Sequence, residues 1–274
     1  MLISVVLYGN SLGEVRALLA SIKGAKGRIA MHLIDHTPGG LSFMAEMKLP
    51  ERVQYKLQEK NKGYGAGHNV AINDESVQAR YHLIMNPDVH FEGTLLDQLV
   101  QFMDNHDGVH LVMPKIVWPN GADQGLRKLL PAPGHLLARR FLPGILQKLL
   151  KNYLNQYEMK SCPAQHSFMV PALSGCFMFC RKAPLLQVGG FDERFFMYLE
   201  DVDLSRRLGM LGENRYWPEV QVVHHYQKGS YRLGRHLFWH LQSAFRYFNK
   251  HGWWRDPWRR QVNAKALKEC AALK

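Results

Sequence analysis

Apolar residues in the first half of the chain form short continuous runs, and the segments between them carry apolar residues at helical spacing. Continuous runs of this length are typical of strands buried on both faces of a sheet. The expected strands are residues 2–7, 29–34, 53–57 and 81–85. The expected helices are residues 13–22, 66–77 and 94–105. This alternation predicts an α/β fold with a Rossmann-like, mostly parallel central sheet flanked by helices.

Polar residues close three of these runs. Tyr8, Asp35 and Asp88 each follow an apolar run, so we expect all three at one edge of the sheet. Ligands of such sheets bind at the carboxyl ends of the strands, where a cleft could hold a nucleotide. Asp35 is then a candidate acceptor of hydrogen bonds from a base or ribose, although an aspartate after a strand is also a common turn residue.

A glycine-rich segment, residues 61–69, follows the third expected strand. Its three glycines at alternate positions permit close approach of backbone and ligand, and the helix that begins there offers free N–H groups to an anion. The spacing fits neither a Walker loop nor the dinucleotide-binding fingerprint. By itself the segment indicates only a flexible turn.

Two further positions carry potential metal ligands. Asp88, fixed by the preceding Pro87 at a strand end, is a hard-oxygen ligand suited to Mg²⁺ or Mn²⁺ carrying a diphosphate. The alternative is an Asx-Pro turn. His224 and His225 follow an apolar run at residues 217–223 and could return an imidazole to the same cleft.

Three carboxylates, Glu200, Asp201 and Asp203, lie between a turn rich in aromatic residues (residues 191–199, the aromatic turn) and the start of an amphipathic helix. Repulsion between close acids raises at least one pKa, and a carboxylate in an aromatic cleft can serve as a general base. The alternative is structural, because acids favour the first turn of a helix and Asp203 can pair with Arg207 four residues later.

Composition sets limits on the class of protein. The 274 residues are 46% hydrophobic and 21% charged, which is a globular composition with room for one large domain and a small appendage. No apolar run is long enough to span a membrane, and the N-terminus reads as a strand rather than a signal peptide. A cytoplasmic location and reduced cysteines are therefore expected.

The net charge of +12 is concentrated near the end of the chain. From Tyr226 onward there are eleven Lys or Arg residues against two acids, together with four of the six tryptophans. Basic residues interleaved with indoles suit an anionic lipid surface. A nucleic-acid surface would show the same bias, and a solvated helix whose aromatics pack on the domain is the structural alternative.

The order of these motifs resembles that of the family 2 inverting glycosyltransferases, which have the GT-A fold, and within that family most closely the bacterial rhamnosyltransferases of O-antigen and cell-wall assembly. The resemblance spans roughly residues 1 to 250. The matching segments are residues 5–8, 33–36, 61–69, 85–88, 174–178, 190–204 and 224–225.

The resemblance implies a role for each motif. Asp201 matches the catalytic base, with Glu200 as a helper, and Asp88 matches the last acid of the metal-binding DXD motif, whose first acid is replaced here by Asn86. His224, or His225 in its place, matches a second metal ligand. The residues expected to contact the nucleotide sugar are Tyr8, Asp35, Asn61, Gly63, Gly65, Asn69, Asn86 and Asp88. Those expected to contact the acceptor are Ser174, Gly175 and Asp203.

The implied reaction is an inverting transfer of L-rhamnose from dTDP-rhamnose to a saccharide acceptor, often one linked to polyprenyl diphosphate, with Mg²⁺ or Mn²⁺ bound to the donor diphosphate. Transfer of galactofuranose, glucose or N-acetylhexosamine is an alternative, as is a non-catalytic sugar-binding module. We expect residues 1–225 to form the catalytic domain, with a nucleotide-sugar half at about 1–110 and an acceptor half at 111–225. Residues 226–274 are expected to form a basic helical region that places the protein on the inner face of the cell membrane, without a nucleic-acid partner.

Overall fold

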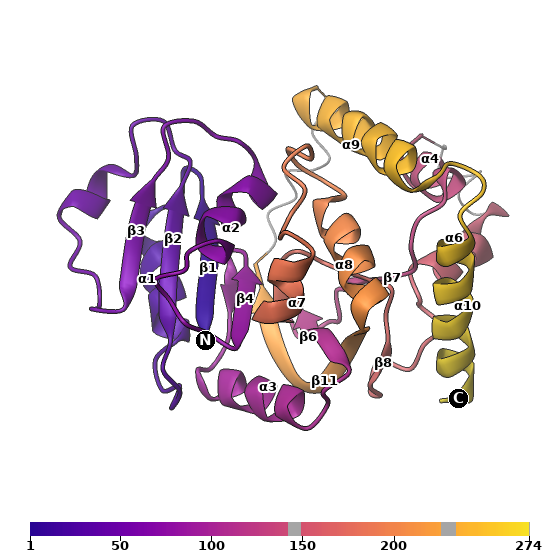
Figure 1. The fold of residues 1–274 in the computed structure, drawn as a ribbon, viewed down its shortest axis with the longest axis horizontal. Helices are drawn as coiled ribbons and strands as arrows, with labels where there is room; N and C mark the ends of the chain where they lie inside the picture. Colours follow the sequence, from indigo (N-terminus) through magenta and orange to yellow (C-terminus); the bar gives the residue numbers. More distant parts are fainter. Residues whose placement is uncertain (142–148, 226–233, 274) are drawn as a thin grey trace.

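A mixed sheet forms the centre of the molecule in the computed structural model, which describes residues 1–141, 149–225 and 234–273 (Figure 1). Within the described residues the strand order is β3-β2-β1-β4-β10-β6-β11-β5, and β8 pairs with β11. The strands of the N-terminal half are β1 (Leu2–Leu7), β2 (Ala30–Asp35), β3 (Val53–Leu57), β4 (Tyr81–Met85) and β5 (Val89–His90). Those of the second half are β6 (Val109–Val117), β8 (Phe168–Met169), β10 (Phe177–Arg181) and β11 (Glu213–His224), and the short β7 (Arg127–Lys128) and β9 (Ala172–Leu173) pair with each other.

The N-terminal half has the predicted parallel arrangement. β1 pairs in parallel with β2 and β4, and β2 pairs in parallel with β3. The helices of this half are α1 (Leu12–Ser21), α2 (Tyr64–Ile72) and α3 (Thr94–Asp104), with a 3₁₀ turn at Ser42–Ala45. β4 is buried along its whole length, which explains why its sequence is mostly apolar, with His82 as a buried polar residue. The predicted α/β fold with a central sheet flanked by helices is thus confirmed.

Strand direction changes in the second half of the sheet. β10 lies antiparallel between β4 and β6, while β11 runs parallel to β6. The register of β11 shifts between Trp217 and Gln221, where Pro218 has no N–H to donate to the ladder. The end of β11 then pairs with β5, which brings the carboxyl end of β11 beside the loop that follows β4.

Most of the described helices of the second half lie toward one end of the molecule, whereas α7 (Lys182–Gln187) and α8 (Glu200–Leu211) lie near its middle (Figure 1). α9 lies across the top of the view above α8, and α10 runs down the right-hand side near β8. These helices are α4 (Pro133–Phe141), α6 (Lys151–Tyr157), α7 (Lys182–Gln187), α8 (Glu200–Leu211), α9 (Arg235–His251) and α10 (Pro257–Ala272). Residues 226–233 of the predicted C-terminal region lie outside the described residues. No helix in the described ranges combines the length and apolar character needed to cross a membrane.

A second apolar cluster joins this helical end to the domain. Phe195 and Leu199 of the aromatic turn, Tyr247 and Phe248 of α9 and Val262 of α10 are buried together in it. The faces of α9 and α10 that bear these residues are therefore packed on the turn that leads into α8, rather than solvated.

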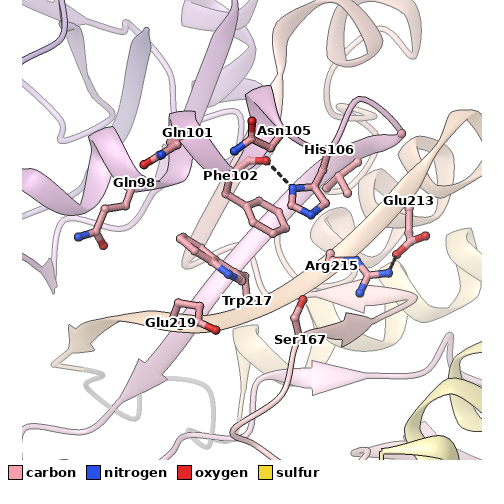
Figure 2. Close-up of a pocket in the computed structure, with 12 residues that line it drawn as sticks. Gln98, Gln101, Phe102, Asn105, His106, Ser167, Glu213, Arg215, Trp217 and Glu219 are labelled. Carbon is pink, nitrogen blue, oxygen red and sulfur yellow. Dashed lines mark hydrogen bonds and ion pairs between the residues drawn. The ribbon is translucent and has the colours of Figure 1, made fainter.

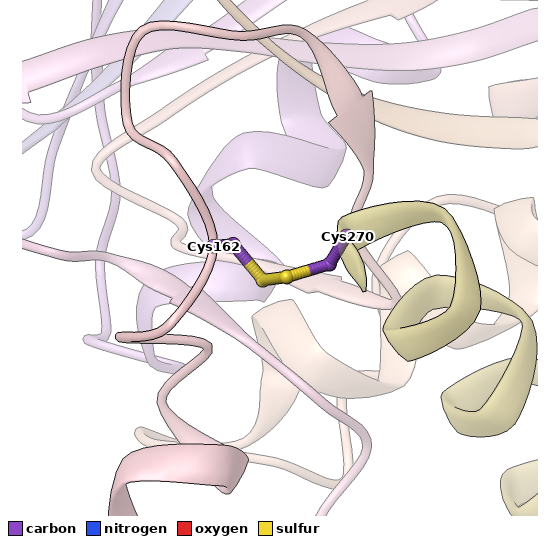
Figure 3. Close-up of a disulfide and its surroundings, with 2 residues drawn as sticks. All are labelled: Cys162 and Cys270. Atoms are coloured by element: carbon purple, nitrogen blue, oxygen red, sulfur yellow. A yellow bond between two sulfur atoms is a disulfide. The ribbon is translucent and has the colours of Figure 1, made fainter. Parts of the chain in front are cut away.

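One expectation about the cysteines is wrong. Cys162 and Cys270 form a disulfide that joins the loop before β8 to the last turn of α10 (Figure 3). The two residues are 108 positions apart, and no local spacing in the sequence indicates the pairing. Cys176 and Cys180 are free and buried, as expected for core thiols.

Candidate active site

Asp88 and His224 meet at the carboxyl end of the sheet. Pairing of β5 with β11 places His224 opposite Val89, and His224 Nε2 lies 3.3 Å from Asp88 Oδ1. The Asp88 carbonyl oxygen also accepts a hydrogen bond from the backbone N–H of His225. The structure thus brings together the two predicted metal ligands, whereas the exposed ring of His225 packs on His90 instead.

Gln124 orients the His224 ring. Its Nε2 donates to the His224 carbonyl oxygen at 2.8 Å, which leaves its Oε1 facing His224 Nδ1 at 2.9 Å. Because an amide oxygen accepts, Nδ1 is the nitrogen that donates to Gln124, and Nε2 is the nitrogen that faces Asp88. A partner of this kind commonly fixes a metal-binding histidine in the required tautomer. Nothing in the sequence marked Gln124 for this role.

These side chains fit a divalent cation that is held mainly by its substrate. They supply one carboxylate and one oriented imidazole, and the described residues contain no cluster of three or more potential metal-binding side chains. Mg²⁺ needs only one or two protein carboxylates when phosphates and water complete its coordination. Asn86, at the position where the resemblance predicts an acid, donates its backbone N–H to the Cys176 carbonyl oxygen at 3.0 Å.

The predicted nucleotide-binding residues differ in accessibility. Tyr8 is exposed, but Asp35 is fully buried. Asp35 Oδ1 accepts the N–H of Thr37, and Oδ2 accepts the N–H of Leu41 and the hydroxyl of Tyr55. Burial, with a contribution from Asp35, raises the pKa of Tyr55 to about 12. The Asp35 carboxylate therefore holds the loop after β2, which favours the turn alternative over direct nucleotide contact.

The glycine-rich segment packs closely on the aromatic turn. Gly63 has a φ of 101°, and a Cβ there would lie 2.2 Å from the carbonyl oxygen of Phe196. A Cβ on Gly65 would lie 2.7 Å from the side chain of Phe191. Asn61 Oδ1 accepts the N–H of Gly63 at 2.9 Å, which fixes the turn that precedes α2. These glycines are thus required for backbone packing, whatever contact they make with a nucleotide.

Asn69 extends the same contact. Its side-chain amide pairs with the backbone of Phe191 in both directions, at 2.8 Å to the N–H and 2.9 Å to the carbonyl oxygen. Asn69 is only 4% exposed. Its amide therefore joins α2 to the aromatic turn.

The three acids of the cluster lie in three different environments. Asp201 is half-buried, and its two carboxylate oxygens accept the backbone N–H groups of Gly175 and Val202 at 2.9 and 2.8 Å. Glu200 is buried, and burial together with the nearby charge of Asp201 raises its pKa well above the usual value. Glu200 therefore favours its neutral form, while Asp201 is held in place with part of its surface accessible.

Asp203 is occupied by structural contacts. It has no exposed surface, and its oxygens lie 2.7 Å from Arg207 Nε, Lys250 Nζ and His251 Nε2. These partners hold the pKa of Asp203 below its ordinary value despite its burial. The predicted pairing with Arg207 is present, and the absence of accessible surface on Asp203 favours that alternative over acceptor contact.

Tyr64 lies close to both the predicted metal ligand Asp88 and the acids that begin α8. The hydroxyl of Tyr64 donates to the Gly175 carbonyl oxygen at 2.6 Å, beside the N–H that Asp201 accepts. The pKa of Tyr64 is raised well above its ordinary value. Burial is the main cause, and the thiol of Cys176 and the charges of Asp88 and of both acids at the start of α8 add to it.

A pocket of about 180 Å³ opens at Asp201. The backbone before α8 is strained there, since Tyr198 and Leu199 have φ values of 70° and 62°. Ser174, predicted to contact the acceptor, lines this pocket, and Gly175 is buried behind it against Asp201 and Tyr64. Other polar lining residues are Lys128, Glu200 and His240.

A larger groove, of about 1030 Å³, lies elsewhere, between α3 and the first half of β11 (Figure 2). Phe102 is stacked between His106 and Trp217 beside it, and Arg215 forms an ion pair with Glu213 at its edge. This groove lies toward the amino ends of β6 and β11. Ligands of α/β sheets bind at the opposite, carboxyl ends, so the smaller pocket at Asp201 is the better candidate for the chemistry.

Known proteins resemble this chain along most of its length, although no protein-family model matches it. It is 30% identical over 263 residues to the N-acetylglucosaminyl-diphospho-decaprenol L-rhamnosyltransferase of Mycobacterium tuberculosis, covering 90% of this chain and 84% of the relative. Rhamnosyltransferase WbbL of Escherichia coli is 26% identical over 197 residues, and this alignment covers 67% of this chain and 70% of the relative. The crystal structure of GalNAc-T7 with UDP, GalNAc and Mn²⁺ matches with a TM-score of 0.65 and 12% identity over 98% of this chain. The chain spans about half of that protein, 51%, and the likeness shows a shared fold.

Proposed function

The chain belongs to the family 2 glycosyltransferases with the GT-A fold, among their rhamnosyltransferase-like members, and from this premise we propose that it transfers L-rhamnose from dTDP-rhamnose to a lipid-linked saccharide in bacterial surface polysaccharide synthesis. The names of both relatives support the choice of sugar, and the name of the mycobacterial relative supports a polyprenyl-diphosphate-linked acceptor. The observation that carries the proposal is the position of Asp201, a half-buried carboxylate at a pocket, with Tyr64 close enough to feel the charges of both Asp201 and Asp88.

Asp201 is the proposed general base. It takes the proton from an acceptor hydroxyl, which attacks the anomeric carbon from the face opposite the nucleotide and inverts its configuration. Two backbone N–H groups hold the carboxylate in one orientation, which supports this role because a base must be within hydrogen-bond reach of its proton. Glu200, whose pKa is raised, remains a proton-bearing neighbour and does not compete as a second base.

Asp88 and His224 are the proposed ligands of Mg²⁺ or Mn²⁺. When bound, the cation would supply charge that stabilises the diphosphate leaving group. Gln124 keeps His224 Nε2 available for coordination by holding the proton on Nδ1. Mn²⁺ in the GalNAc-T7 structure supports a divalent cation for this fold.

Replacement of Asp201 by Asn tests the proposed base. We expect the turnover number with dTDP-rhamnose to fall by about 10²- to 10⁴-fold, the usual contribution of a general base, while thermal stabilisation by the donor with Mn²⁺ is retained. Asp107→Asn, at a surface carboxylate that is 97% exposed, is a matched control and should transfer at the wild-type rate. Near-normal transfer by Asp201→Asn would contradict the assignment. A thermal shift with a different nucleotide sugar and none with dTDP-rhamnose would contradict the proposed donor.

We also propose that α9 contacts an anionic membrane surface. Phe238, Leu241 and Phe245 are 62%, 45% and 58% exposed, and their spacing places them on one face of the helix. The exposed Trp254 and Arg255 follow the end of α9. Apolar and basic side chains in this arrangement suit the interface of an anionic bilayer.

Co-sedimentation with vesicles of phosphatidylglycerol tests this surface. Phe238→Ser with Phe245→Ser should abolish binding that the wild type shows at low salt, whereas Leu186→Ser, at an exposed leucine on α7, should leave it intact. Equal binding by the double variant would rule out α9 as the contact.

A further inference from the structure

α9, the first of the two helices near the end of the chain, contributes one wall of the pocket at Asp201. His240 of α9 and Lys128 of β7 line it together with the two acids that begin α8. Its remaining walls include the apolar side chains of Leu126, Leu136, Leu173, Leu199 and Val202. The pocket therefore places two carboxyl groups, a lysine ammonium, an imidazole and an apolar wall around one small volume.

The position of His240 is set by the strained turn before α8. Its ring packs on Tyr198 at 5.3 Å, and the hydroxyl of Tyr198 is 3.0 Å from Nδ1 of His236, one turn earlier on α9. Ser243 donates to the Met197 carbonyl oxygen at 2.8 Å. These contacts hold α9 against residues 197–198, so the position of His240 in the pocket wall is fixed by the fold.

The charge of the pocket bears on what can enter it. A saccharide is neutral and needs only hydrogen bonds, but a diphosphate brought near Glu200 and Asp201 is repelled by any negative charge there. Binding a diphosphate in this pocket therefore requires cations to offset the acids. Lys128 supplies a fixed positive charge, and an imidazole such as His240 donates from a ring nitrogen.

We propose that Lys128 and His240 bind the diphosphate of the acceptor and so select lipid-linked over free saccharides. This inference rests on the proposed function, because it assigns the recognition of the acceptor within the same site. An isoprenoid chain leaving the pocket would meet apolar side chains both on the pocket wall and in the exposed row of α9, the helix that carries His240. The donor diphosphate is assigned to Asp88 and His224, neither of which lines this pocket.

The test compares two acceptors in the full-length protein: N-acetylglucosamine on a short polyprenyl diphosphate, and a neutral alkyl glycoside of the same sugar. The measured quantity is the ratio of kcat/KM for the two. Lys128→Met and His240→Asn should each lower this preference by about 10- to 100-fold, the range expected for a lost hydrogen bond to a charged group. Lys128→Arg retains the positive charge and should retain most of the preference. Lys265→Met, at an exposed lysine on α10, is the control and should leave the ratio unchanged.

The outcomes separate this inference from the function on which it rests. If Lys128→Met and His240→Asn lower kcat/KM equally for both acceptors, the two residues only shape the pocket and the inference is overturned. If the wild type shows no preference for the diphosphate acceptor, it is overturned as well, while glycosyl transfer stands. If the wild type transfers rhamnose to neither acceptor, the proposed function fails first.

Discussion

The ion pair between Arg206 and Asp256 ties α8 to the C-terminal helices and gives a sharp test of how they are joined. The two side chains are 4% and 2% exposed and meet through two hydrogen bonds of 2.6 and 2.8 Å. Asp256 also caps α10 by accepting the N–H of Arg259 at 2.9 Å. Replacing Asp256 by Ala leaves a buried guanidinium without its partner, which costs about 3–5 kcal/mol, and removing the cap adds about 1 kcal/mol. We therefore expect the free energy of unfolding, measured by urea titration, to fall by roughly 4–6 kcal/mol.

A second variant separates the buried charge from the lost contact. Arg206→Met combined with Asp256→Ala removes the Arg206 charge together with its partner and leaves Arg259, 3.7 Å from Asp256 in the wild type, bonded to the carbonyl oxygens of Pro131 and Trp253. The double variant should therefore be destabilised less than Asp256→Ala alone. Arg80→Ala, in an ion pair that is 74% and 37% exposed, is the surface control and should cost no more than about 1 kcal/mol. The reasoning is refuted if Asp256→Ala costs as little as that control. It is also refuted if the double variant is less stable than the single one.

Three other perturbations follow from the packing. Gly63→Ala places a Cβ 2.2 Å from the Phe196 carbonyl oxygen at a φ of 101°, so it should lower the free energy of unfolding by more than about 1 kcal/mol; an unchanged urea midpoint would contradict that close contact. Burial lowers the pKa of His68 from 6.5 to about 3. Because the unfolded chain then binds a proton that the folded chain does not, the free energy of unfolding should fall by about 1.4 kcal/mol per pH unit as the pH falls from 6.5 toward 3, with no contribution from His68 above pH 6.5. Urea midpoints between pH 8 and 4 should show this fall, with a smaller slope in His68→Gln. Reduction of the Cys162–Cys270 disulfide, which spans 108 residues, should cost about 4–5 kcal/mol in the chain-entropy model, and Cys162→Ser should be insensitive to reductant.

The N-terminal strands could be predicted because their burial is complete. β1 and β4 are covered on both faces, so their sequences are largely apolar and could be recognised without knowledge of distant partners. The exceptions, Ser4 and His82, are buried and hydrogen-bonded to each other. β11 was predicted only from residue 217, whereas it begins at Glu213. Its first residues alternate between buried and half-buried positions and include charged side chains, and Pro218 interrupts the run, so no continuous apolar pattern marks that start.

The site was predictable only where strand ends determine it. Asp88 and His224 follow strands, and the rule that strand ends share an edge was enough to bring them together. Gln124 lies in a loop 100 positions from His224, and its role depends on a contact that exists only in the folded chain. The partners of Asp203 on α9 were missed for the same reason, since 47 and 48 residues separate them in sequence.

The contacts of α8 explain why the C-terminal helices bear on catalysis although they carry none of the recognisable motifs. Asp201 stands in the first turn of α8, and its carboxylate is positioned by an N–H from Gly175 on a different element. Keeping that 2.9 Å contact requires α8 to be fixed in both position and rotation. Asp203 stands in the same first turn and Arg206 about one turn further along the helix. Their buried partners, apart from Arg207, come from α9 or the cap of α10. Loosening those helices should therefore reduce turnover by moving the proposed base, even in a variant whose pocket residues are all intact.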